Sequence, residues 1–188
     1  MKCIAAFFAL AAAMACPAAF AQTPAPSCLP KTTLDELIKA VDDGVSGPAN
    51  KDRTCFRDLF TADARLAPMV KAADGSYAPK MLAVQDWIDA VAKHGSVLFL
   101  EKQIKVKSEV YGRIAHLWST YETRENSPDS KPEARGINSI QAVNDGKRWR
   151  IVEIVWQAET PDAPVPAKYL PQAGSNKSHA SHSTQNRR

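Results

Sequence analysis

Three consecutive strand-like segments between Gly112 and Ala158 constrain the fold more than any other feature of the sequence. Each segment mixes β-branched and aromatic residues with polar ones, a composition that favours half-buried strands. Asn144-Asp145-Gly146 separates the last two segments, and an Asp-Gly pair between such runs is a strong hairpin signal. The pattern predicts a curved antiparallel sheet with polar groups directed into a pocket.

Helix signals precede this sheet. Thr33-Leu34-Asp35-Glu36 has the form of a capping box, in which a threonine and a glutamate three residues later bond each other's backbone amides. The apolar residues that follow recur at helical spacing until Gly44, which predicts a first helix. Similar patterns predict a short second helix over 52–60 and a third helix over 81–94.

A long strand is expected over 97–110, after the third helix. Its length requires a bend or a bulge, because the apolar positions change parity along it. Leu98 and Leu100 are the apolar residues of its first half, so Glu101, Lys105 and Lys107 are predicted to point outward. A polar loop over 127–132 is expected between two of the later strands.

The two ends of the chain differ from this central part. Residues 1–21 have a positive start, an apolar run and an Ala-Phe-Ala site, which predict a signal peptide cleaved after Ala21. An extended arm (22–32) precedes the predicted domain (33–159). A proline-rich strap (160–172) and a disordered polar, basic tail (173–188) follow it.

The signal peptide predicts a periplasmic or secreted protein. Cys16 follows Ala13-Met14-Ala15, which faintly resembles a lipobox, so lipoprotein processing at Cys16 is the alternative. Cleavage after Ala21 leaves two cysteines, Cys28 and Cys55, and an oxidising compartment favours their pairing as a disulfide. Two unrelated buried thiols are the alternative. Neither cysteine has a partner at metal-ligand spacing, so no metal site is expected.

The charge of the chain excludes one class of partner. The sequence has 24 basic and 20 acidic residues, and three of the basic ones, Lys177, Arg187 and Arg188, lie in the tail. The predicted domain is therefore close to neutral and lacks the basic stripe that nucleic-acid binding requires. No segment after the signal peptide is long and apolar enough to span a membrane.

The order of these elements resembles the nuclear transport factor 2-like (NTF2-like) superfamily. The segment Leu59-Phe60-Thr61-Ala62-Asp63-Ala64-Arg65-Leu66 is similar to the family's junction between helix and first strand. The closing run Ile151-Val152-Glu153-Ile154-Val155-Trp156 is similar to the end of its sheet. In detail the chain resembles small exported proteins of the SnoaL-like branch. The resemblance covers about 34–158.

This resemblance implies an α+β cone, in which about three N-terminal helices pack on a curved, mostly antiparallel sheet. A cavity lies between helices and sheet in such proteins, and the outer face of the sheet often pairs two subunits. A homodimer through the sheet is therefore expected. The strand over 114–122 has apolar residues on both faces, so its outer face is predicted to be covered by a dimer partner or by the strap.

Five residues are candidates for a site on this sheet. His116 is the candidate catalytic residue, because histidine side chains titrate near neutral pH. A core histidine held by a neighbour is the alternative, since no orienting acid is assigned; Glu101, Glu122 and Glu153 are possible partners. The candidate cavity residues are Trp118, Tyr121, Asn138 and Trp156, although the aromatic residues are equally suited to core packing.

Three hypotheses for the function follow. In the first, the protein binds a small apolar molecule or a peptide in the cone without catalysis. In the second, it is a cofactor-independent lyase or isomerase with His116 as base and Asn138 or Tyr121 as polarising donor. In the third, it is a dimerising accessory subunit. The sequence lacks phosphate-loop, nucleophile-elbow and metal motifs, so no cofactor is expected.

Overall fold

A computed structural model describes residues 27–172 of the chain. The predicted signal peptide, its cleavage after Ala21, Cys16 and the predicted tail lie outside the described residues. The helices are α1 (Leu34–Val45), α2 (Thr54–Arg57), α3 (Val84–Ala92) and the 3-10 helix η1 (Ala167–Tyr169). The strands are β1 (Gly47–Pro48), β2 (Phe60–Lys71), β3 (Tyr77–Pro79), β4 (Leu82–Ala83), β5 (Leu98–Tyr111), β6 (Ile114–Glu125), β7 (Ala134–Asn144) and β8 (Trp149–Ala158).

The capping box at the start of α1 is present in the structure. The Thr33 hydroxyl accepts a hydrogen bond from the Glu36 amide at 3.2 Å, and the Glu36 carboxylate accepts one from the Thr33 amide at 3.1 Å. These bonds satisfy amides that the first helical turn otherwise leaves without partners. They also fix the rotation of α1, whose buried residues Leu37 and Val41 join the core.

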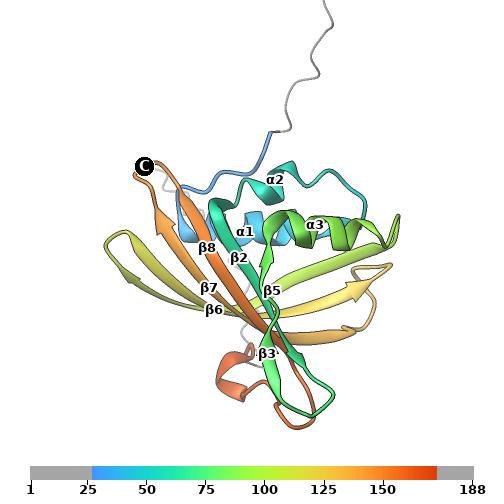
Figure 1. The fold of residues 1–188 in the computed structure, drawn as a ribbon. Helices are drawn as coiled ribbons and strands as arrows, with labels where there is room; N and C mark the ends of the chain where they lie inside the picture. Colours follow the sequence, from blue (N-terminus) through green and yellow to red (C-terminus); the bar gives the residue numbers. More distant parts are fainter. Residues whose placement is uncertain (1–26, 173–188) are drawn as a thin grey trace, which may run out of the picture.

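One curved sheet, ordered β1-β5-β6-β7-β8-β2-β3, carries the fold, and the three α-helices lie on its concave side (Figure 1). Neighbouring strands are antiparallel, except that β2 and β8 run parallel. This pairing places the first long strand of the domain beside its last strand. The predicted hairpin turn joins β7 to β8. There, Asp145 accepts hydrogen bonds from two following amides, and Gly146 adopts the left-handed conformation that this turn requires.

Two predicted helices are shorter than expected. α2 covers only Thr54–Arg57, and β2 already begins at Phe60. α3 begins at Val84, because the residues before it form β4, in which Leu82 pairs with Leu66 of β2. Tertiary pairing with a neighbouring strand therefore overrides the local helical pattern at both boundaries.

β5 contains the expected irregularity, and it changes which side chains face the helices. Gln103 pairs with Tyr121 and Lys105 pairs with Thr120, so Ile104 is an extra residue on β5. Odd-numbered residues face the helices before this bulge and even-numbered residues do so after it. The prediction that Glu101 points outward is therefore wrong, and its side chain lies on the concave side.

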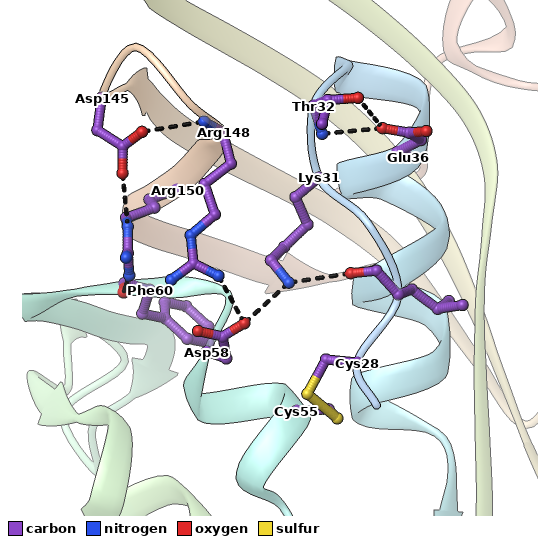
Figure 2. A network of polar contacts seen from close by, with 11 residues as sticks. Cys28, Lys31, Thr32, Glu36, Cys55, Asp58, Phe60, Asp145, Arg148 and Arg150 are labelled. Carbon is purple, nitrogen blue, oxygen red and sulfur yellow. Dashed lines mark hydrogen bonds and ion pairs between the residues drawn. A yellow bond between two sulfur atoms is a disulfide. The ribbon is translucent and has the colours of Figure 1, made fainter. Parts of the chain in front are cut away.

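The N-terminal arm is attached to the domain by one covalent link and several polar contacts (Figure 2). Cys28 and Cys55 form the predicted disulfide. The buried ammonium group of Lys31 lies 2.9 Å from the Asp58 carboxylate, which also accepts a 2.8 Å bond from Arg148. The carbonyl oxygen of Lys31 accepts a hydrogen bond from the Trp149 amide at 2.7 Å. The arm thus joins α2 to the start of β8.

The strap lies on the outer face of the sheet, opposite the helices (Figure 1). The Thr120 hydroxyl donates a hydrogen bond to the Tyr169 carbonyl oxygen at 2.6 Å, and the Lys105 ammonium group donates one to Leu170 at 2.8 Å. The ring of Tyr169 lies 5.8 Å from the ring of Trp118. These contacts bury Thr120 completely. The strap therefore covers part of the outer face of the sheet. It does not lie on the concave side, where the helices pack.

Candidate functional site

A cavity of about 280 Å³ lies between the helices and the concave face of the sheet. The three helices form one wall, and strands β2, β5, β6, β7 and β8 form the other. Most of the lining is apolar or aromatic, and the polar groups are gathered on the sheet wall. The lining residues are Val41, Val45, Phe56, Leu66, Trp87, Phe99, Glu101, Tyr121, Thr123, Ala134, Asn138, Ile154 and Trp156.

The polar groups of the sheet wall form one network around Glu101. One carboxylate oxygen of Glu101 accepts hydrogen bonds from the Gln103 amide at 2.9 Å and from the Asn138 amide at 3.3 Å. The Gln103 side-chain oxygen in turn accepts from the Ser119 hydroxyl and from Asn138. Strands β5, β6 and β7 therefore hold the carboxylate in one orientation.

Glu101 is the only carboxylic acid among the described residues that line the cavity, and none of these residues is a lysine, arginine or histidine. Desolvation by the surrounding protein raises its pKa to about 7, although the bonds from Gln103 and Asn138 oppose this shift. The nearby carboxyl group of Asp42 on α1 raises it further. The pKa of Asp42 is itself raised by burial, against a 2.9 Å hydrogen bond from the Gln103 backbone amide.

Tyr121 lies beside this carboxylate. Burial and the negative charge of Glu101 both raise the pKa of its phenol, which therefore stays protonated. Its hydroxyl group makes no hydrogen bond within residues 27–172 and lines the cavity. The cavity thus combines one acidic acceptor and one free hydroxyl donor on the same wall.

The sequence matches no protein-family model and no curated protein. Solved structures are similar to the chain. A cystatin-like-fold protein of unknown function from Nostoc punctiforme is 13% identical, with TM-score 0.51, and the match covers 70% of this chain and 91% of that one. The β subunit of a putative aromatic-ring-hydroxylating dioxygenase from Novosphingobium aromaticivorans is 14% identical, with TM-score 0.51, over 68% and 87%.

An NTF2-like protein of unknown function from Shewanella baltica is 14% identical, with TM-score 0.46, over 68% of this chain and 91% of that chain. The likeness in fold rests on the Nostoc and Novosphingobium structures, and the helices on the concave side of a curved sheet agree with it. The chain has the NTF2-like fold. At these identities the likeness concerns the fold alone, and the SnoaL-like branch stays a prediction.

Three of the predicted cavity residues line the cavity of this NTF2-like domain. Tyr121, Asn138 and Trp156 come from three adjacent strands, and their side chains reach the same space. Gly136 lies beneath Tyr121, and a methyl group at this position would overlap both the Gln157 carbonyl oxygen of β8 and the tyrosine hydroxyl. The ring of Tyr121 is therefore positioned by the absence of a side chain on β7.

His116 and Trp118 lie on the outer face, so the prediction that Trp118 lines the cavity is wrong, and the candidate catalytic residue His116 lies outside the cavity. On β6, alternate residues point to opposite faces, and Ala115, Leu117 and Tyr121 occupy the concave one. His116 Nε2 lies 3.0 Å from the Ser139 hydroxyl, and its ring is 5.9 Å from that of Trp118. No carboxylate forms a hydrogen bond to His116 within residues 27–172.

Glu101 is the central residue of the site, and its role was not recognised in the sequence. A glutamate between Leu100 and Lys102 is typical of a solvent-facing position on a strand. The available signal was the change of apolar parity along β5, which required a bulge of unknown position. Placing that bulge after Gln103 would have turned Glu101 toward the helices.

A second hollow of about 240 Å³ lies on the outer face, between the sheet and the strap. Trp118, Ile137 and Val155 line it from the sheet, and Val165 lines it from the strap. The described residues contain no cluster of His, Cys, Asp and Glu that could hold a metal ion. Between residues 27 and 172, no helix has the length and apolar character needed to cross a membrane.

Proposed function

We propose that this protein binds a small, mostly apolar molecule in the cavity between its helices and its sheet. The observation that carries the proposal is the composition of the cavity: an apolar and aromatic lining with a fixed polar network on one wall. Binding sites for small molecules commonly combine such a lining with a few oriented polar groups. The volume of about 280 Å³ suits a molecule of one or two rings.

A neutral aromatic probe, 2-naphthalenemethanol, tests this proposal by titration calorimetry. Ala134 is exposed and lines the cavity where β7 begins, so Ala134→Phe should block the cavity and abolish binding. Ala163→Phe is the matched control, because Ala163 is equally exposed but lines the outer hollow. If A163F abolishes binding and A134F leaves it unchanged, the proposal is contradicted and the ligand lies under the strap.

Cofactor-independent proton transfer, as in a lyase or isomerase, is the second candidate function. A carboxyl group with a pKa of about 7 exchanges protons readily at neutral pH, and the Tyr121 hydroxyl is a suitable donor to a developing oxyanion. Glu101 replaces His116 as the candidate base. Deuterium exchange at an activated C–H bond of a bound ketone, lost in Glu101→Gln while binding persists, is the expected result. Equal exchange in E101Q would exclude this role.

Two further proposals concern where the protein acts and in what state. Export to the periplasm or the exterior is supported by the Cys28–Cys55 disulfide. A homodimer would use the outer face beyond the strap, where Tyr111 is 83% exposed and Ile114 is 59% exposed. Light scattering should then give a dimer mass for the mature chain and a monomer mass for Ile114→Glu. The accessory-subunit hypothesis gains no support from the strap, which lies away from the cavity.

A further inference from the structure

The cavity holds negative charge without a cation. Glu101 lines it directly, and the Asp42 carboxyl group lies near enough to act on Glu101. No lysine, arginine or histidine is among the described residues that line the cavity. The guanidinium of Arg53 lies 5.6 Å from the centre of the Trp87 ring, but it donates its hydrogen bonds to the carbonyl groups of Gly44 and Val45 at the end of α1.

The Glu101 carboxylate is only partly satisfied by the protein. One oxygen accepts both amide bonds, and the other has no hydrogen bond within residues 27–172. A carboxylate in an apolar site is costly unless a positive charge pairs with it. Around this carboxylate the described lining supplies amide donors and ring faces but no positive charge.

Five aromatic rings surround the same space. Phe56 and Trp87 contribute from the helices, and they stack on each other with centres 4.5 Å apart. Phe99, Tyr121 and Trp156 contribute from the sheet. Aromatic faces attract cations, and the attraction is stronger where water is excluded. An organic ammonium ion fits such an environment. Its charge can pair with the carboxylate, and its hydrocarbon part can pack against the rings.

We propose that the ligand of this cavity is a small apolar amine, bound as its ammonium ion with the nitrogen at Glu101 and its hydrocarbon part against the aromatic rings. This inference rests on the proposed binding function and names its ligand class. A carboxylic acid is excluded by repulsion from Glu101 and Asp42. A neutral alcohol can donate one hydrogen bond to Glu101 but brings no charge, so it binds more weakly than the matched amine.

The protonation of Glu101 gives this binding a pH dependence. The ionisable groups that face Glu101 are Asp42 from α1 and Tyr121 from β6, while Gln103 and Asn138 contribute amides. Strands β2 and β8 and helices α2 and α3 contribute no ionisable residue to the described lining. With a pKa of about 7, about one-tenth of Glu101 is ionised at pH 6 and about nine-tenths at pH 8. Ammonium binding should therefore strengthen about tenfold over this range.

A matched pair of probes tests the inference: 2-naphthylmethylamine and 2-naphthalenemethanol, titrated into the mature chain at pH 6 and pH 8. We expect the amine to bind about tenfold more tightly than the alcohol at pH 8. That preference should fall about tenfold at pH 6, while alcohol binding changes little. Glu101→Gln should bind both probes equally at pH 8, and Glu109→Gln, on the exposed part of β5, should behave as the wild type.

The outcomes separate this inference from the proposed function. If the alcohol binds at least as tightly as the amine at pH 8, the amine inference is overturned and cavity binding stands. If neither probe binds, both fail. The pH dependence of the wild-type protein is a complete test by itself, so the inference remains testable even if E101Q does not fold. Amine preference that is equal at pH 6 and pH 8 would exclude Glu101 as its source.

Discussion

Replacing Glu101 by glutamine tests the electrostatics of the cavity without any ligand. Glutamine keeps the shape of the side chain and an oxygen that can accept from Gln103 and Asn138, but it cannot ionise. The change therefore removes one buried negative charge and little else. Asp42 remains in both proteins, so its own contribution cancels to a first approximation.

The size of the effect follows from the pKa of Glu101. The group titrates at about 7 in the folded protein and at 4.5 in an unperturbed chain, so the folded state holds the proton more tightly. The contribution of Glu101 to stability is therefore greatest at low pH and declines as the pH rises from about 4.5 through 7. The full difference corresponds to about 3 kcal/mol, and most of it falls between pH 5 and pH 8.

Urea denaturation followed by tryptophan fluorescence, with the disulfide intact, measures this difference. The free energy of unfolding of E101Q, relative to that of the wild type, should increase by about 2 to 3 kcal/mol from pH 5 to pH 8. E109Q removes only an exposed pair with Lys107, so it should stay within about 0.5 kcal/mol of the wild type at both pH values. A stability difference for E101Q that is the same at pH 5 and pH 8 would refute the argument.

Three further changes have defined expectations. Replacing Cys28 and Cys55 by serine should lower the free energy of unfolding in urea by about 3 kcal/mol, because the bridge closes a loop with a sequence separation of 27; reducing agent should then affect only the wild type. Asp58→Asn should cost about 2 kcal/mol at pH 7, since it leaves the buried Lys31 ammonium with the Leu29 carbonyl oxygen but without a charged partner. Burial opposes ionisation of Asp58, but its two cationic partners lower its pKa. The cost should therefore begin to shrink as the pH falls below about 4 and disappear only below the lowered pKa. Gly136→Ala should cost about 3 kcal/mol and displace Tyr121, visible as an altered aromatic circular dichroism spectrum.

The features that the sequence predicted well are made by residues close together in the chain. The capping box at Thr33 spans four residues, and the turn at Asn144–Gly146 is held by hydrogen bonds that the Asp145 carboxylate accepts from the amides two and three residues later. Such structures depend on side chains that form hydrogen bonds with nearby backbone groups. Their sequence pattern can therefore be recognised without knowledge of the fold.

The parts of the site that escaped prediction depend on partners distant in sequence. The bulge in β5 is defined only by its register with β6, and Glu101 faces the cavity because of it. On β6, His116 and Tyr121 belong to two alternating sets that both contain apolar residues, because the strap covers one face and the helices cover the other. Burial on both faces removes the polar alternation that would have distinguished the cavity side.

The parallel contact between β2 and β8 means that the cavity is completed by the first long strand and the last strand of the domain together. Leu66 and Ile154, which pair across this contact, both line it. Contacts so distant in sequence can form only at the entropic cost of closing a long loop. A chain halted before β8 docks would possess the helices but no binding site. A bound ligand would therefore stabilise only the molecule in which β2 and β8 are paired. Ligand binding to the cavity would then report that the domain is completely folded.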